Sequence, residues 1–130
     1  MTSPRYYILV GDKESWIVSL SGNIWGFSQR SVGSWNSSRI GDYVAYYVTS
    51  PLKKVIGYGR ITSKFVSEDL IWPDEITFRK PIWKFRIKFR RLHLLDDWEM
   101  GIPVPQNIML NTGRKVIDKH MFFSIISQLA

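Results

Sequence analysis

The chain has 130 residues, with 18 Lys or Arg against 11 Asp or Glu, a formal net charge of +7 and no Cys. This length fits one domain over residues 1–130, and the lack of Cys excludes disulfide frameworks, Cys-based zinc sites and thiol nucleophiles. No apolar run exceeds about five residues, so we expect a cytoplasmic domain without a membrane span or signal peptide. Six Trp, six Tyr and seven Phe accompany the positive charge. Cations attract phosphates and flat rings stack on bases, so this composition favours a nucleic-acid partner.

The first elements expected along the chain are a buried strand and a short helix. The aromatic and β-branched run Tyr6–Val10 predicts the strand. Asp12 is expected to cap an amphipathic helix that ends at Gly22. Residues 23–27 predict a second short strand, and residues 28–39, which are rich in Ser, predict a flexible polar segment.

A β-hairpin is predicted next. Residues 43–49 are rich in Tyr and Val, residues 50–53 form a turn, and residues 55–65 return as the second strand. Gly57 and Gly59 lie within the return strand, which indicates a bend or a close approach of another backbone segment.

Residues 83–90 alternate four apolar with four cationic side chains. A period of two predicts a strand with the apolar residues on one face and the cations on the other. The tail over 117–129 repeats apolar residues at helical spacing, and Asp118 is expected to cap this helix. Short strands with a helix near each end predict an α+β domain built on a small, strongly curved sheet or barrel.

Enzymatic signals are weak. His93 lies near Asp96 and Asp97, but a turn with solvated carboxylates is favoured over a metal site. A weak hydrolase that uses His120 with Asp118 stays open as the least favoured function, and it predicts turnover that is lost in His120→Ala. We therefore expect a non-catalytic protein with no metal and no cofactor.

The basic run from Arg79 to Arg91 has seven cations among thirteen residues and no acidic residue. An ordinary solvated face usually mixes the two signs, so the run favours a phosphate-binding track over a face that only prevents aggregation. The expected phosphate ligands on the strand are Lys84, Arg86, Lys88 and Arg90.

The tryptophans divide into two groups. Trp16 and Trp83 lie on apolar faces and are interpreted as core residues. Trp25, Trp35 and Trp72 lie beside or within segments without strand periodicity, where a ring has less core to fill. Two such rings can stack on both faces of a flipped base, so they are candidates for a base pocket.

Several short segments, in order, resemble the EVE domains of the PUA-like superfamily, which are related to YTH domains. The resemblance spans about residues 5–126 and rests on the order and spacing of its motifs. The motifs are residues 6–10, 23–26, 40–47, 55–61, 71–73, 81–87 and 109–116.

The resemblance implies a curved mixed sheet and a pocket that takes one nucleobase, commonly a modified one, between aromatic rings. Trp25 and Trp72 match the two cage walls, and Asp12 matches a polar residue at the base edge. Gly26 departs from the small hydroxyl residue of YTH domains, so the backbone amide there would replace a side-chain contact.

The leading hypothesis is a non-catalytic domain that binds RNA or DNA and accommodates a single base, unmodified or methylated, in an aromatic pocket. Trp35 or Tyr46 would supply a third wall. Lys119 and His120 match positions near backbone-contacting residues of the relatives. The alternative is a protein- or small-ligand-binding module whose basic strand meets an acidic partner. Its affinity would respond less steeply to salt than that of a nucleic-acid binder.

Overall fold

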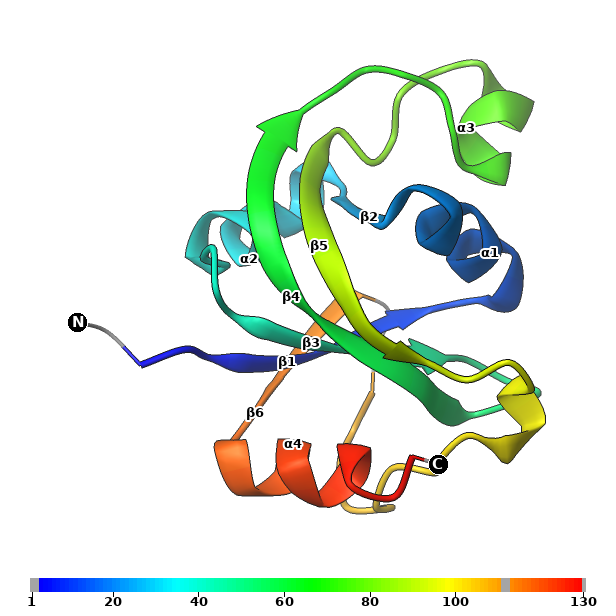
Figure 1. Ribbon diagram of the computed structural model, residues 1–130. Helices are drawn as coiled ribbons and strands as arrows, with labels where there is room; N and C mark the ends of the chain where they lie inside the picture. The colour runs from blue at the N-terminus through cyan, green and yellow to red at the C-terminus, as the bar shows by residue number, and fades with distance from the viewer. Residues whose placement is uncertain (1–2, 111–112, 130) are drawn as a thin grey trace.

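The computed structural model describes residues 3–110 and 113–129, which form one curled six-stranded sheet with helices around it (Figure 1). The strand order is β2-β5-β4-β3-β1-β6. The strands are β1 (Tyr6–Gly11), β2 (Ile24–Phe27), β3 (Tyr43–Val48), β4 (Lys54–Val66), β5 (Phe85–Leu94) and β6 (Gly113–Ile117). The helices are α1 (Lys13–Gly22), α2 (Val32–Ser37), α3 (Pro73–Phe78) and α4 (Lys119–Ile126), with 3₁₀ turns at Gln29–Ser31 and Trp98–Met100. The predicted α+β class with a curved mixed sheet is confirmed.

The predicted hairpin is the antiparallel pair β3–β4, and β4 continues into a long pairing with β5. The register of β4 shifts near its glycines. A Cβ on Gly57 would lie 2.3 Å from the carbonyl oxygen of His93, and one on Gly59 would lie 2.4 Å from that of Arg90. The predicted close backbone approach is therefore confirmed, and it lets the β4–β5 ribbon curl.

Apolar side chains pack on both faces of the sheet. Along β1, Tyr7 and Leu9 pack with Trp16 of α1 in the core on one face of the sheet, which we call the inner core. Tyr6 and Ile8 pack beneath α4 in the core on the other face, the outer core. Because both faces of β1 are covered, its sequence is a continuous apolar run and not an alternating one. Figure 1 shows α4 on one side of the sheet and α1 and α2 on the other.

The predicted helices at the two ends are confirmed. The Asp12 carboxylate accepts a hydrogen bond from the Ser15 N–H at 2.7 Å, and α1 ends where Asn23 takes a left-handed conformation. Asp118 accepts from the Met121 N–H, also at 2.7 Å. Helix α4 begins two residues later than Ile117, because Ile117 pairs with Tyr6 as the last residue of β6.

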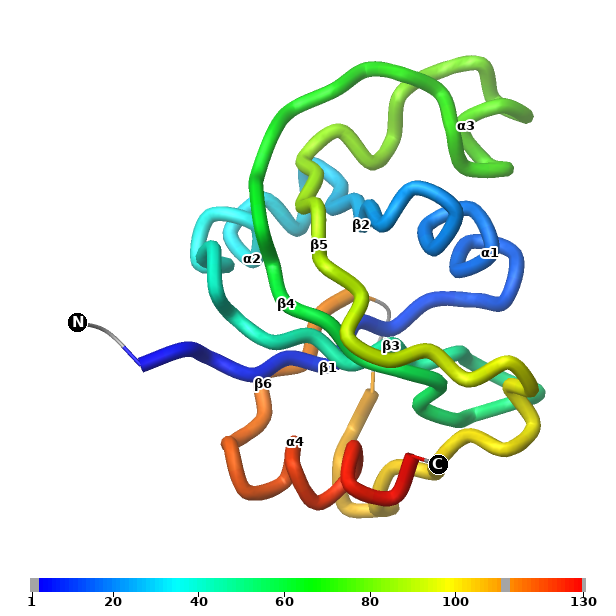
Figure 2. Tube along the Cα trace, viewed as in Figure 1, coloured from blue at the N-terminus to red at the C-terminus, as the bar shows by residue number. Residues whose placement is uncertain are grey.

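Three elements differ from the sequence-based expectation. The polar segment 28–39 is not a flexible loop but a 3₁₀ turn followed by α2. The Trp35 indole N–H anchors α2 by donating to the Arg86 carbonyl at 2.9 Å. Helix α3 and strand β6 were not predicted. The tube in Figure 2 shows the chain leaving β4, forming α3 and returning into β5. None of the helices described is long and apolar enough to cross a membrane.

Candidate functional site

A pocket of about 120 Å³ lies where the curled sheet brings the edge strand β2 back toward the end of β1. Its walls come from β1, the start of α1, β2 and the segment that carries α3. The aromatic walls are Trp25, Phe27, Trp72 and Trp83. A closed cavity of roughly 150 Å³ admits a benzene ring. The pocket is therefore of the size of one planar ring.

Four of the six residues predicted to form a base pocket meet here. Trp25, Gly26, Trp72 and Asp12 all line the pocket, although they come from different elements. Trp25 is 6% exposed and Trp72 is 3% exposed. Both rings therefore pack into the fold as well as forming walls. Asp12 lines the pocket with the same side chain that caps α1.

Trp35 and Tyr46 do not line the pocket, so the prediction that one of them completes it is wrong. Tyr46 is fully buried on the inner face of β3, with its ring centroid 5.1 Å from those of Trp16 and Phe89. Trp35 is partly buried and packs against Phe85, with the ring centroids 5.4 Å apart. Tyr46 is therefore a core residue, and Trp35 packs against the same core.

Trp83 supplies the third tryptophan wall, although the alternating pattern placed it in the core. Its ring is half-buried, and its indole N–H donates to both carboxylate oxygens of Asp74, at 2.9 and 3.1 Å. Strand pairing of β5 begins only at Phe85. Trp83 therefore lies before the paired strand to which its alternating pattern assigned it. Pro81, two residues earlier, is the sequence signal that could have shown that the strand begins later.

Gly26 allows Trp72, which precedes α3, and Trp83, which follows it, to lie close to β2. A Cβ at this position would lie 2.5 Å from the Cβ of Trp83 and 2.8 Å from the Trp72 ring. These distances are shorter than real Cβ contacts, so any larger residue would push both rings away from β2. The glycine is thus explained by packing at the pocket.

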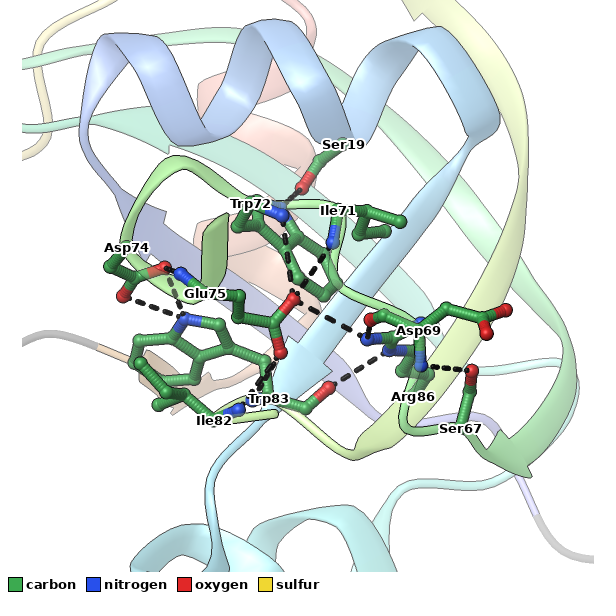
Figure 3. A network of polar contacts seen from close by, with 10 residues as sticks. All are labelled: Ser19, Ser67, Asp69, Ile71, Trp72, Asp74, Glu75, Ile82, Trp83 and Arg86. Carbon is green, nitrogen blue, oxygen red and sulfur yellow. Dashed lines mark hydrogen bonds and ion pairs between the residues drawn. The ribbon is translucent and has the colours of Figure 1, made fainter. Parts of the chain in front are cut away.

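A buried carboxylate holds the α3 segment together (Figure 3). Glu75 accepts hydrogen bonds from four backbone N–H groups, two before the helix and two after it. These are Ile71 at 3.1 Å, Trp72 at 3.4 Å, Ile82 at 2.9 Å and Trp83 at 3.0 Å. Burial alone raises the pKa of Glu75, but the four hydrogen bonds favour the charged form and hold the pKa below its ordinary value. The carboxylate therefore fixes the backbone at both pocket tryptophans of this segment.

Arg86 is the counter-ion of Glu75, and its prediction as a phosphate ligand is wrong. Its side chain is 2% exposed, and its guanidinium lies 3.5 Å from the Glu75 carboxylate. It also donates to the Trp83 carbonyl at 2.9 Å and to the Asp69 carbonyl. The guanidinium lies 5.0 Å from the centre of the Trp72 ring. The network in Figure 3 is therefore a clamp that positions Trp72 and Trp83.

The remaining cations of the strand are more accessible. Lys88 and Arg90 are exposed, and Lys84 is half-buried just before β5. Lys88 pairs in register with Ile24, two residues from Gly26 in the pocket.

Lys119 and His120 are exposed but do not lie beside the pocket. Strand β6 runs from Gly113, which lines the pocket, to Ile117, which pairs with Tyr6 at the other end of β1. The two residues follow Ile117 directly. Within the described residues no three His, Asp or Glu side chains are grouped to hold a metal ion, and His93 with Asp96 and Asp97 forms no such group.

The sequence matches no protein-family model and is not significantly similar to any curated protein. Its fold, however, resembles several solved structures. A variant of ZmASCH from Zymomonas mobilis superposes with a TM-score of 0.70 at 10% identity, over 100% of both chains. The YTH domain of Zygosaccharomyces rouxii MRB1 in complex with N6-methyladenosine RNA gives 0.64 at 16% identity, over 100% of this chain and 90% of that one.

The YTH domain of Mmi1, in complex with RNA, gives a TM-score of 0.65 at 14% identity, over 97% of this chain and 81% of the other. The predicted resemblance to PUA-like, YTH-related domains is thereby confirmed at the level of the fold. Within the segment 109–116 that contributed to it, Asn111 and Thr112 lie outside the described residues.

Proposed function

We propose that this chain is a non-catalytic nucleic-acid-binding domain that takes a single unpaired base, methylated or unmodified, into the tryptophan pocket. The observation that carries the proposal is the meeting of Trp25, Trp72 and Trp83 around a space of the size of one planar ring. Stacking of one base on aromatic side chains contributes roughly 1–3 kcal/mol to binding. A methyl group on the base adds apolar surface that prefers these walls to water.

Hydrogen bonds within the chain hold the pocket in shape. The Trp72 indole N–H donates to the Ser19 hydroxyl at 2.9 Å, which ties the α3 segment to α1. Trp83 is fixed by Asp74, and the backbone at both rings is fixed by Glu75. Rings that are already ordered lose little conformational freedom on binding, so more of the stacking energy appears as affinity.

The solved structures of similar fold support RNA as the partner to test first. The Mmi1 YTH domain was solved with RNA and the MRB1 YTH domain with N6-methyladenosine RNA. The exposed Lys88 and Arg90 and the half-buried Lys84 supply cations near the pocket for the phosphates.

The test is a titration of single-stranded RNA against variants of Trp83. This ring is half-buried, so its removal disturbs the core less than removal of Trp25 or Trp72. We expect Trp83→Ala to weaken binding roughly 5- to 100-fold, which corresponds to the loss of one stacking surface. Trp83→Phe keeps a ring and should lose less. Fluorescence anisotropy on otherwise identical RNAs with and without one N6-methyladenosine measures the effect.

Trp98→Ala is the matched control, because Trp98 is also a half-buried tryptophan but lies in the 3₁₀ turn outside the pocket. It should bind as the parent does. Equal affinity of Trp83→Ala and the parent would overturn the base pocket. RNA binding that depends on Lys88 and Arg90 but not on Trp83 would indicate contact with the phosphates alone, without a base pocket.

A further inference from the structure

The pocket has the opposite charge to the rest of the molecule. The whole chain carries a net charge of +7, yet the charged residues that line the pocket are two carboxylates, Asp12 and Asp74. Among the described residues that line the pocket there is no Lys or Arg. The hydroxyl groups of Ser15 and Ser31 also belong to the polar part of the wall.

Each carboxylate lies at the start of a helix, so part of its charge is offset. A long helix contributes roughly +0.5 of an elementary charge at its N-terminus. Helix α1 has 10 residues and α3 has 6, so their combined contribution is at most about +1. An offset of at most about +1 does not cancel two carboxylates, so negative charge remains in excess among the described lining residues.

The cations that adjoin lining residues in the sequence are not themselves part of the described pocket wall. Arg30 precedes Ser31 and Lys84 follows Trp83, but neither lines the pocket. Arg114 follows the lining residue Gly113, but its guanidinium donates to the Ser34 carbonyl and the Ser38 hydroxyl and lies over the Tyr7 ring. Lys13 follows Asp12 but lines a separate groove, together with Asp96, Asp97 and Glu99. Arg86 lies against Trp72, where its charge is balanced by Glu75.

We propose that the pocket selects a base that carries a positive charge, as a base methylated on a ring nitrogen does. The inference rests on the proposed function, since it specifies which base the tryptophan pocket prefers. Tryptophan is the best aromatic partner for a cation, and the attraction grows when the cation is removed from water. Asp12 and Asp74 add a direct Coulomb attraction and can accept hydrogen bonds from the N–H groups of a charged base.

Two isomers of methyladenine isolate the effect of charge. In 1-methyladenine the methyl group is on a ring nitrogen and the base is cationic at neutral pH. In N6-methyladenine the same methyl group is on the exocyclic nitrogen and the base is neutral. Two short single-stranded RNAs of one sequence, each with one of these isomers at the centre, therefore differ in charge but not in atom count apart from the proton.

We expect the RNA with 1-methyladenosine to bind about tenfold tighter than its N6-methyl isomer at pH 7, within the range of a partly desolvated cation–π contact. Asp74→Asn keeps an acceptor oxygen for Trp83, and Asp12→Asn keeps a good helix cap. Each should reduce the preference to about threefold or less. Asp118→Asn is the matched control, because it removes the same charge from the cap of α4, at the other end of β1, and should keep the tenfold preference.

Equal affinities for the two isomers, or tighter binding of the neutral one, would overturn the charge selectivity. A preference that survives in Asp12→Asn and Asp74→Asn alike would overturn the role of the carboxylates. In either case the proposed function still stands if Trp83→Ala weakens binding of both RNAs. If Trp83→Ala binds both RNAs as the parent does, the pocket itself is not used and the proposed function fails.

Discussion

The two halves of the alternating run, residues 83–86 and 87–90, carry the same alternation of cations and apolar residues, but the fold uses them in opposite ways. In the first half, Arg86 is buried beneath the α3 segment and paired with Glu75. In the second half, Lys88 and Arg90 are exposed. The difference comes from the chain between β4 and β5, which folds back over the strand near Gly26 and Arg86 but leaves the rest uncovered.

The comparison teaches that the alternating pattern alone does not decide the role of a cation, because Arg86 is paired within the fold whereas Lys88 and Arg90 are exposed. A buried charge without a partner is very costly, so Arg86 can lie in the interior only because Glu75 lies there too. The exposed cations are solvated and need no such partner. The following variants separate the half of the run that is buried from the half that is proposed to bind phosphates.

The largest effect is expected from Glu75→Ala. This change leaves the Arg86 charge buried without its partner and removes the acceptor of four backbone N–H groups. We expect the free energy of unfolding to fall by about 3–5 kcal/mol, measured by urea denaturation with tryptophan fluorescence.

Lys88→Ala, in the exposed half of the run, is the control. Its free energy of unfolding should lie within about 0.5 kcal/mol of that of the parent. Glu75→Gln keeps the shape and one acceptor oxygen, so it should fall between the two. If the free energy of unfolding of Glu75→Ala were within 1 kcal/mol of that of the parent, the clamp would not stabilise the α3 segment.

The pH dependence of stability should reveal the contribution of the Glu75 carboxylate. The pKa of Glu75 is lower in the folded protein than its ordinary value of 4.5, so the unfolded state binds the proton more readily. Its contribution to stability is therefore complete above about pH 4.5 and is lost as the pH falls through the folded pKa. Denaturation curves between pH 6 and pH 3 should show a steeper loss of stability for the parent than for Glu75→Gln. Parallel pH profiles would contradict the assignment.

The smallest effect is expected from substitutions in the exposed half of the run, which should change RNA binding but not stability. Lys88→Ala and Arg90→Ala should leave stability unchanged and weaken RNA binding by a similar factor for every sequence and modification. Each should also reduce the slope of log affinity against log salt by about one. Trp83→Ala, by contrast, should change the preference among bases. An unchanged salt slope in both Lys88→Ala and Arg90→Ala would place the phosphates elsewhere on the molecule.

Much of the fold was predictable because it follows from local patterns. The buried strand at 6–10, the caps Asp12 and Asp118, the hairpin and the strand at the alternating run all lie near where the sequence placed them. Helix α3 and strand β6 were missed. Helix α3 has only six residues and is held by the hydrogen bonds that buried Glu75 accepts from the backbone before and after it, which no periodic pattern shows. Strand β6 pairs along its whole length with β1, more than a hundred residues earlier in the chain.

The candidate site was predicted only in part. Trp25 and Trp72 were found because they lie beside segments without strand periodicity. Trp83 was missed because its alternation resembled that of a core residue. Trp35 and Tyr46 were placed at the pocket wrongly, since nothing in their local sequence shows that one hydrogen-bonds to the Arg86 carbonyl and the other packs between Trp16 and Phe89.

The sequence by itself determined the class of the protein: a basic, tryptophan-rich α+β domain with a curved sheet. Such properties depend on composition and on short periodic patterns, which act within a few residues. Only the tertiary structure decided which tryptophans share a pocket, which cation is neutralised and what charge the pocket carries. These depend on the return of the α3 segment over β2 and β5, which brings Glu75 to Arg86 and Trp83 to Asp74. The packing of distant segments, rather than any local pattern, thus turned a basic chain into one with an acidic aromatic pocket.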